Sequence, residues 1–242
     1  MQHAPRLADR LALITGATRG IGRAVALAYA REGAHLILVG RTAGALEEVD
    51  DEVRECGRPA TLLTLNLNDL DRIDALGPTI FQRWGKLDIL VGNAGVLGPL
   101  SPLGHVTAEA WKDVIDLNLN TNWRLIRTLD PLLRRSEAGR AIFVTSGAAA
   151  NRRAYWGPYS VSKAGLEALV QTYAAEMVNT NVRANLINPG PVRTAMRAKA
   201  FPGEDPATLR WPDAITERFV ELAEAASNYN GRIFDLKTNE VR

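Results

Sequence analysis

The sequence lacks the features that mark secreted, membrane-spanning and nucleic-acid-binding proteins. Its 242 residues include a single cysteine, Cys56, so no internal disulfide can form and a reducing compartment is expected. No apolar run approaches the ~20 residues needed to cross a bilayer, and Met1–Arg6 have no apolar core of the kind found in signal peptides. The net charge of +2 gives no electrostatic reason to bind nucleic acid or an anionic membrane. We therefore expect a cytoplasmic protein that binds neither, and no metal site.

Nothing in the sequence divides the chain into parts. It has no low-complexity linker, no shift in composition and no internal repeat. A chain of 242 residues, of which 46% are hydrophobic, can bury one sizeable core. We expect a single domain over residues 1–242.

Short aliphatic or β-branched runs alternate with longer segments of helical periodicity. Because the runs are apolar on both faces, they are typical of a parallel sheet covered by helices on both sides. Alternation of this length predicts a Rossmann-like, doubly wound α/β fold of about seven parallel strands. The predicted strands are Leu11–Thr15, His35–Gly40, Thr61–Asn66, Leu87–Gly92, Ala141–Ser146, Val182–Asn188 and Arg232–Asp235. The predicted helices lie near Ile21–Arg31, Ala43–Cys56, Leu70–Trp84, Ala108–Arg135, Tyr159–Asn179 and Asp213–Ser227.

One segment interrupts this alternation. Prolines recur through Pro189–Pro212, between the sixth predicted strand and the last predicted helix. A long connection after a strand of an α/β sheet is often a lid over the active site. We expect that role here.

A glycine turn follows the first predicted strand, in Thr15–Gly22. Strand, glycine turn and helix form the arrangement in which a pyrophosphate binds at a helix N-terminus. Gly16 allows a sharp turn, Gly20 removes a Cβ where backbone approaches phosphate, and Gly22 lets the helix pack on the sheet. A plain tight turn is the alternative, but its place on the first strand of an alternating chain favours a dinucleotide site.

The second predicted strand ends without the acidic residue that binds the ribose 2′-hydroxyl of NAD. Arg41 stands there instead, and Arg19 lies in the glycine turn. A guanidinium suits a 2′-phosphate, so we expect NADP(H) rather than NAD(H). Two solvated surface charges are the alternative. Asn66 is placed to accept from the adenine amino group, and Asn93–Gly95 put small residues beside the adenine ribose.

Tyr159 and Lys163 are four residues apart in a predicted helix, so their side chains lie on one face, one turn apart. A neighbouring ammonium favours a phenolate and lowers the pKa of a tyrosine. The pair is therefore suited to general acid–base chemistry, with Lys163 also able to reach ribose hydroxyls. A polar pair on a solvated helix face is the alternative, but the helix continues with mostly apolar residues.

Two further polar residues are candidates for the same chemistry. Ser146 ends the fifth predicted strand, where ligands bind in open α/β sheets, and can donate to a substrate oxygen. Taken singly, it would rather be interpreted as a turn or capping residue. Asn118 lies in the middle of a predicted helix, where asparagine is unfavourable, which suggests a task such as holding a relay water. Asn120 and Asn122 lie close by in the same predicted helix and are alternative candidates for this task.

These motifs together resemble those of the single-domain short-chain dehydrogenase/reductase family over nearly the whole chain. The resemblance implies a catalytic tetrad of Asn118, Ser146, Tyr159 and Lys163, and a loop over the nicotinamide. With the assignments above, the cofactor-binding set is Gly16, Thr18, Arg19, Gly20, Ile21, Gly22, Arg41, Asn66, Leu67, Asn93, Ala94, Gly95, Tyr159, Lys163, Pro189, Gly190, Val192 and Thr194.

The sequence departs from the family pattern at three places. The usual first asparagine before Asn93 is Gly92, the usual acid at the adenine site is Asn66, and the usual glycine pair near the C-terminus is missing. The stretch after Val192 looks like a bacterial subgroup of oxidoreductases with no settled substrate.

The sequence thus predicts an NADP(H)-dependent enzyme that interconverts a carbonyl and a secondary alcohol. An apolar or cyclic substrate is expected from the residues predicted to line its pocket, Leu97, Ala148, Tyr155, Trp156, Pro191, Met196 and Phe201. Surplus apolar residues in Ala108–Arg135 and Tyr159–Asn179 indicate a homodimer, with a tetramer as the alternative. A non-enzymatic NADP-binding regulator on the same fold is the competing hypothesis, and epimerisation or dehydration a weaker one.

Overall fold

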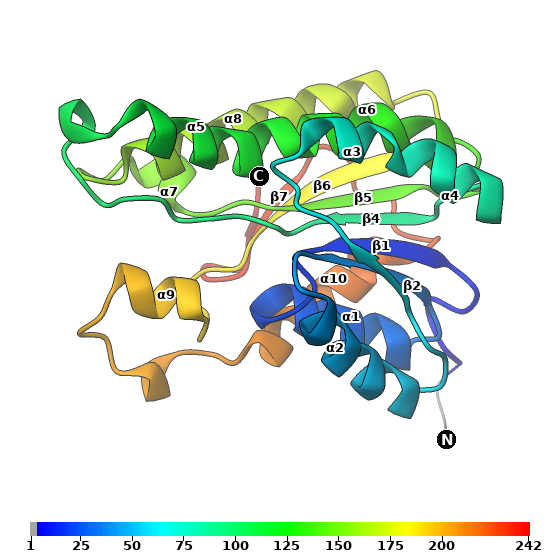
Figure 1. Cartoon of the computed structure of the whole chain (residues 1–242). Coiled ribbons are helices and arrows are strands. Elements are labelled where there is room, and N and C mark those ends of the chain that lie inside the picture. The colour runs from blue at the N-terminus through cyan, green and yellow to red at the C-terminus, as the bar shows by residue number, and fades with distance from the viewer. Residues whose placement is uncertain (1–3) are drawn as a thin grey trace.

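A computed structural model describes residues 4–242 and shows one continuous eight-stranded sheet between two layers of helices (Figure 1). The strand order is β3-β2-β1-β4-β5-β6-β7-β8, and the first seven strands are parallel. The strands are β1 (Leu11–Thr15), β2 (His35–Gly40), β3 (Thr61–Thr64), β4 (Ile89–Gly92), β5 (Arg140–Val144), β6 (Arg183–Asn188), β7 (Ile233–Asp235) and β8 (Glu240–Val241). The predicted doubly wound fold is confirmed, and the seven predicted strands are present with small shifts of their ends.

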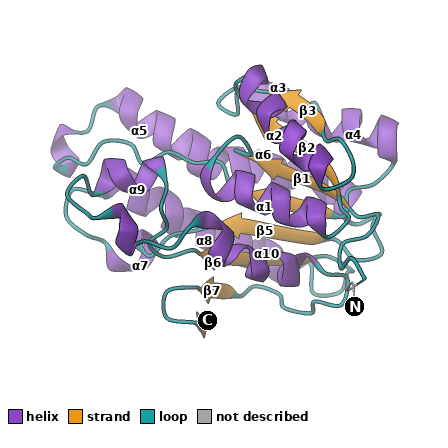
Figure 2. Cartoon of the chain, turned by 90° about the horizontal axis from the view of Figure 1, so that it is seen from below, coloured by secondary structure: helices purple, strands orange, loops and turns teal. Residues whose placement is uncertain are grey.

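The central strands β1, β2, β4, β5 and β6 are buried on both faces, which explains why they are largely apolar. Along β1, Ala12 and Ile14 belong to one core, while Leu11 and Leu13 belong to the other. The first core lies under α1 (Gly20–Arg31), α2 (Ala43–Glu55) and α10 (Thr216–Ala223). The second lies under α4 (Leu76–Trp84), α6 (Thr121–Leu133) and α8 (Gly157–Glu176). Figure 2 shows α1 and α10 together over one face of the sheet.

Three predicted helices differ from the structure in ways that have local causes. The predicted helix Leu70–Trp84 is two helices, α3 (Leu70–Asp74) and α4, because Pro78 near the start of α4 lacks the N–H that would continue an earlier helix. The predicted helix Ala108–Arg135 is α5 (Ala108–Ile115), a π-helical turn η2 (Asp116–Asn120) and α6. The predicted last helix opens as a 3₁₀ turn, η4 (Pro212–Ile215), before α10.

Several short elements were not predicted at all. The two 3₁₀ turns η1 (Leu103–His105) and η3 (Pro206–Thr208), the helices α7 (Ala148–Asn151) and α9 (Ala195–Ala200), and β8 are each between two and six residues long. Such pieces carry too little periodicity to stand out in a sequence. β8 pairs antiparallel with β7, so it covers the outer edge of that strand.

The proline-rich segment after β6 contains α9 and η3 and is closed by a bridge between Val192 and Arg210. In Figure 1 it extends, in yellow and orange, beyond the sheet on the side of α7. It is therefore an ordered excursion beyond the strand ends, as a lid requires. Within residues 4–242, no helix has the length and apolar character needed to cross a membrane. The first three residues of the Met1–Arg6 segment lie outside the described part of the chain.

Candidate active site

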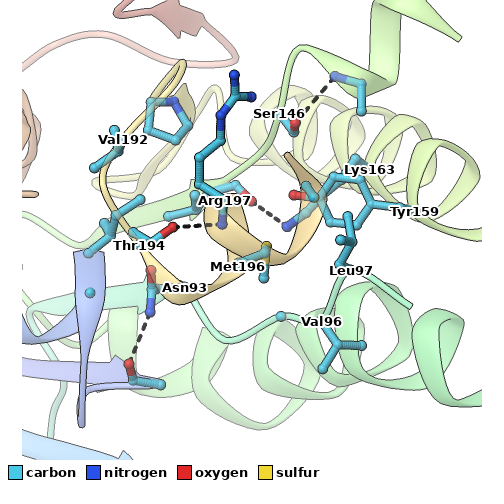
Figure 3. Close-up of a pocket in the computed structure, with 18 of the residues that line it drawn as sticks. Asn93, Val96, Leu97, Ser146, Tyr159, Lys163, Val192, Thr194, Met196 and Arg197 are labelled. Carbon is cyan, nitrogen blue, oxygen red and sulfur yellow. Dashed lines mark hydrogen bonds between the residues drawn. The ribbon is translucent and has the colours of Figure 1, made fainter. Parts of the chain in front are cut away.

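The sheet reverses its winding between β1 and β4, and a cleft of about 1690 Å³ opens at the carboxyl ends of these strands. Crevices at such switch points are where α/β sheets bind ligands. All the site residues predicted from the sequence line this cleft except Gly22 and Asn118. In Figure 3, Ser146, Tyr159 and Lys163 gather on one side, facing Asn93, Val192 and Thr194 on the other.

The glycine turn between β1 and α1 depends on the absence of side chains. Gly16 and Gly20 have φ values of 65° and 56°, a region that L side chains rarely adopt. A Cβ on Gly22 would lie 2.2 Å from the Gly16 carbonyl oxygen. Gly22 therefore supports the turn from beneath and does not line the cleft, whereas Gly16 and Gly20 do.

The first turn of α1 is free to bind an anion. Its N-cap residue, Arg19, makes no capping hydrogen bond through its side chain, and the first turn carries no acidic residue. The leading N–H groups of a helix otherwise need partners, and they attract negative charge. Arg19 and Arg41 are exposed at the rim of the same cleft. This end of the cleft is suited to phosphate groups.

Asn93 joins the ends of β1 and β4. Its side-chain amide donates to the carbonyl oxygens of Thr15 and Gly16 at 2.9 and 3.2 Å. Thr15 Oγ1 accepts from the backbone N–H groups of Asn93 and Ala94 at 3.0 and 3.1 Å. Thr15 is thus a supporting residue that the sequence-based prediction missed, although it stands at a strand end like the other polar site residues.

The missing family asparagine has a steric explanation. A Cβ on Gly92 would lie 2.4 Å from the Phe143 ring and 2.5 Å from Asn122 Oδ1. These neighbours occupy the space that a side chain at Gly92 would need. The departure is therefore accommodated by local packing.

Residues that follow β3 form one end of the cleft, where the sequence predicts an adenine contact. Asn66 is exposed, and its Oδ1 accepts from the backbone N–H of Asn68 at 3.2 Å, forming a short turn. Leu67 is buried, and its carbonyl accepts from Thr121 Oγ1 at 2.7 Å. Both residues line the cleft. The Oδ1 that was predicted to accept from an adenine amino group thus already accepts one backbone hydrogen bond.

Ser146 and Tyr159 face one another across the inner end of the cleft. Ser146 Oγ accepts from the Ala148 N–H at 3.2 Å, so it also serves as the turn residue before α7. Its own O–H is left to donate. The Tyr159 side chain is buried, and the Trp156 ring lies edge-on to it at a centroid distance of 6.0 Å.

The pKa values of the pair differ from the sequence-based prediction. Burial raises the pKa of Tyr159 above its usual value, and the Ser146 hydroxyl opposes this only in part. Burial also lowers the pKa of Lys163 to about 8, opposed by the charge of Glu167. The net direction for Tyr159 is therefore upward and not downward, because the desolvation of its buried side chain dominates.

Lys163 is fixed by the end of β5. Its Nζ donates to the Val144 carbonyl at 2.7 Å and lies 5.9 Å from the centre of the Tyr159 ring. A Cβ on Gly95 would lie 3.7 Å from this Nζ and 3.1 Å from Asn118 Oδ1. The lysine, the Gly95 backbone and the asparagine therefore meet at one point.

Asn118 is fully buried behind this point, within the π-helical turn η2. Its Nδ2 donates to the Val96 carbonyl at 2.9 Å and to Ser162 Oγ at 3.0 Å, and its Oδ1 accepts from the Val96 N–H at 2.8 Å. Both amide hydrogens of Asn118 are therefore used within the protein, so a relay water, the task predicted for this side chain, could contact only its Oδ1. π-helical turns of this kind are frequent at functional sites.

The loop after β6 is held by the C-terminal strands. Asp235 Oδ2 accepts from Asn188 Nδ2 at 2.8 Å, and Asn188 Oδ1 accepts from the Gly190 N–H at 3.2 Å. Gly190 has φ 67°, and a Cβ there would lie 2.9 Å from Lys237 Cβ. The sequence-based prediction missed Asp235. This residue ends the last predicted strand, just as Ser146 ends the fifth.

The apolar wall of the cleft contains six of the seven predicted residues. Tyr155 is the exception, because its side chain is 59% exposed and does not line the cleft. The Phe201 ring lies 5.6 Å from that of Trp156, and the guanidinium of Arg197 stacks on Phe201 at 3.8 Å. Glu204 binds Arg197 through two hydrogen bonds of 2.6 and 2.5 Å. Two adjacent arginines follow α7, in the loop that leads to α8. Arg153 lines the cleft and Arg152 does not.

Residues 10–205 match the family model described as short chain dehydrogenase. The protein therefore belongs to the short-chain dehydrogenase/reductase family of oxidoreductases, as its motifs predicted.

Among its relatives, the chain is similar to the uncharacterized oxidoreductase YciK of Escherichia coli K12, with 38% identity over 95% of this chain and 92% of the relative. It is also similar to the solved structure of a short chain dehydrogenase from Escherichia coli CFT073 complexed with NADPH. That comparison gives a TM-score of 0.92 and 37% identity over 97% of this chain and 99% of the other. A third relative, from Shigella flexneri 2a and complexed with NADP, gives a TM-score of 0.93 and 37% identity over 97% and 100% of the two chains.

Proposed function

We propose that this protein is an NADP(H)-dependent oxidoreductase that interconverts a carbonyl and a secondary alcohol. The observation that carries the proposal is the meeting of Ser146, Tyr159 and Lys163 at the inner end of a cleft whose outer end is a glycine turn. A phosphate-binding turn and a proton-transfer group in one cleft define the reaction class more narrowly than either does alone.

The cleft fits a nicotinamide dinucleotide on its own geometry. Gly16 and Gly95 each bring backbone to the cleft where a Cβ would be within 3.1 Å of another residue. Beside them, the first turn of α1 has no side-chain cap. Arg19 and Arg41 are placed to hold a 2′-phosphate, which supports NADP(H) over NAD(H). Relatives of known structure are complexed with NADPH and NADP, which supports the same choice. In this proposal the residues predicted from the sequence contact the pyrophosphate, the ribose and the nicotinamide.

When bound, the nicotinamide supplies or accepts the hydride. Tyr159 exchanges the proton with the substrate oxygen, and Ser146 donates a hydrogen bond to the same oxygen and positions it. Lys163, charged and fixed on the Val144 carbonyl, stabilises the phenolate that Tyr159 becomes when it gives up its proton. Because burial alone raises the Tyr159 pKa, this charge has to offset the cost of a buried phenolate.

Asn118 has a positioning role in this proposal. It fixes the backbone of Val96 and so holds Gly95 beside Lys163. Its Oδ1 retains a second lone pair for a water that would connect Lys163 to solvent. Gly190, Val192 and Thr194 contact the nicotinamide half from the loop after β6.

The substrate in this proposal is apolar or cyclic. Trp156, Phe201 and Met196 line the same cleft as Tyr159 and Ser146. The Trp156 ring contacts those of Tyr159 and Phe201, and such surfaces bind planar hydrophobic groups.

The test is oxidation of NADPH against a panel of aromatic and alicyclic ketones, diketones, quinones and aldehydes, with Tyr159→Phe in parallel. We expect turnover in the parent protein and a loss of ~10²–10⁴-fold in the variant, with NADPH binding retained. Activity that survives in Tyr159→Phe would contradict the assigned proton donor. Binding of NADPH with no turnover on any substrate would favour a cofactor-binding regulator instead.

The same proposal includes a homodimer. Trp111 on α5, Trp123 on α6 and Val161 on α8 are 37%, 45% and 47% exposed, although large apolar side chains are usually buried. A second copy packed on these helices would cover them. Sedimentation at micromolar concentration should show a dimer, and a monomer alone would contradict this part of the proposal.

A further inference from the structure

Helix α8 carries a third ionisable residue on the face that bears Tyr159 and Lys163. Glu167 follows Lys163 by one turn, as Lys163 follows Tyr159, and residues four apart on a helix lie side by side. Glu167 does not line the cleft, so it touches neither cofactor nor substrate. A carboxylate in line with the catalytic pair but outside the cleft requires an explanation.

Each of the three α8 residues lies against one residue at the end of β5. Lys163 Nζ donates to the Val144 carbonyl at 2.7 Å, and Thr145 Oγ1 donates to Glu167 Oε1 at 2.8 Å. The next residue, Ser146, faces Tyr159. Thr145 is 1% exposed, and its N–H is bonded to the Ile187 carbonyl at 2.9 Å. The anchor of Glu167 is therefore rigid, and its carboxylate is held in one place.

Within residues 4–242, Glu167 is the only acidic residue whose charge acts on Lys163. The elements packed around the lysine otherwise present uncharged groups, namely the β5 end, the Gly95 backbone and Asn118. Asp235 also lines the cleft, but it is bonded to Asn188. Asp116, in the turn that holds Asn118, is paired with Lys112. The charge of Glu167 opposes the burial that lowers the pKa of Lys163 to about 8.

We propose that Glu167 is a positioning residue that keeps Lys163 in its ammonium form, through a carboxylate anchored on Thr145. The catalytic role of Lys163 rests on the proposed reductase function. The claim about the charge of Lys163 does not. An ammonium with a pKa near 8 loses its proton as the pH rises through 8. Without the carboxylate this loss begins at a lower pH, and the phenolate of Tyr159 then lacks its counter-charge.

The first experiment measures the charge itself in the intact protein without substrate. The chain has five lysines, so ¹³Cε-labelled lysine gives few NMR signals, and Lys163→Ala identifies the relevant one. We expect its titration midpoint near pH 8 in the parent protein. In Glu167→Gln it should fall by roughly 0.5–2 pH units, the effect of a unit charge about 6 Å away at effective dielectric constants of 80 to 20.

Glutamine suits this test because it keeps an acceptor oxygen for Thr145 while removing the charge. Glu167→Asp restores the charge and should bring the midpoint back toward the parent value. Glu176→Gln, at the exposed end of the same helix, is the matched control and should leave it unchanged. An unchanged midpoint in folded Glu167→Gln would overturn the inference. If that variant does not fold, Thr145→Val, in which the carboxylate loses its anchor, decides the question: the midpoint should fall below the parent value, and a parent value there would overturn the inference.

The second experiment separates this inference from the proposed function. The alkaline limb of the pH profile of kcat should move to lower pH in Glu167→Gln, with activity near the parent level at pH 6. A midpoint that shifts in the NMR titration without any shift of the pH profile would leave the role of Glu167 intact. It would count against the role of Lys163 in the proposed reaction.

Discussion

The two ends of the cleft are built in different ways. The end proposed for adenine and pyrophosphate is made of backbone: glycines that no side chain can replace, strand ends joined by Asn93, and an uncapped helix start. The end toward α9 is made of side chains from distant parts of the chain, with Phe201 against Trp156 and Arg197 held by Glu204. A backbone site is rigid and serves one ligand, whereas a side-chain site can change its specificity residue by residue.

The largest effect is expected from adding one methyl group at the backbone end. In Gly22→Ala the new Cβ would lie 2.2 Å from the Gly16 carbonyl oxygen, so the turn has to move. We expect a loss of about 3 kcal/mol or more and a Tm lower by roughly 6–12 °C, with NADPH binding abolished. Calorimetry with and without NADPH measures both.

Gly44→Ala is the matched control for this substitution. Gly44 lies in α2, and a Cβ placed there would have no neighbour within 4 Å. Alanine should therefore stabilise the helix by ~0.5–1 kcal/mol and leave NADPH binding unchanged. Equal effects of the two substitutions would contradict the view that the turn is defined by close packing.

A smaller effect, on cofactor affinity, is expected at the rim of the end proposed for adenine and pyrophosphate. Arg41→Ala removes a proposed partner of the 2′-phosphate, and charge-assisted hydrogen bonds of this kind contribute ~1.5–3 kcal/mol. The Kd for NADPH should rise about 10- to 100-fold, while the Kd for NADH stays constant. Fluorescence titration of both cofactors gives the ratio.

Arg72→Ala, on α3 and outside the cleft, should change neither constant. A parallel loss of NADPH and NADH affinity in Arg41→Ala would mean that the arginine supports the fold of the rim and does not read the 2′-phosphate.

The smallest effect is expected at the side-chain end. Glu204→Gln weakens the two-bonded pair with Arg197, whose side chains are 23% and 27% exposed. An ion pair of this exposure contributes little, so the KM of the carbonyl substrate should rise by about fivefold or less. The Kd for NADPH should not change. Steady-state kinetics measure the KM, and Glu137→Gln is the control. Glu137 is exposed and lies outside the cleft, so its substitution would reveal any effect that follows from the loss of a negative charge alone.

This contrast also explains what could be predicted from the sequence. The sheet and the glycine turn follow from local patterns, because apolar strands and glycine spacing act over a few residues. Ser146, Tyr159 and Lys163 were found because each follows a strand end or repeats at helical spacing. The break between α3 and α4 could have been read from Pro78, whose effect is local.

The features that could not be predicted from the sequence depend on contacts between residues far apart in the chain. The loop at Gly190 is held through the bond between Asn188 and Asp235, which are 47 residues apart in sequence, and no local pattern indicates it. The π-helical turn at Asn118 is fixed by its hydrogen bonds to Val96. The direction of the Tyr159 pKa was predicted wrongly because spacing reveals the neighbouring charge but not the depth of burial, and burial dominates here.

The position of Trp156 gives the cleft an optical reporter of its own. Its indole lies between the ring of Tyr159 and that of Phe201, so one neighbour belongs to the rigid helix α8 and the other to the segment that follows α9. Any displacement of that segment changes the surroundings of the indole and hence its emission. Opening and closing over the cleft can therefore be followed in the unlabelled protein, at stopped-flow time resolution, by the fluorescence of a residue already in place.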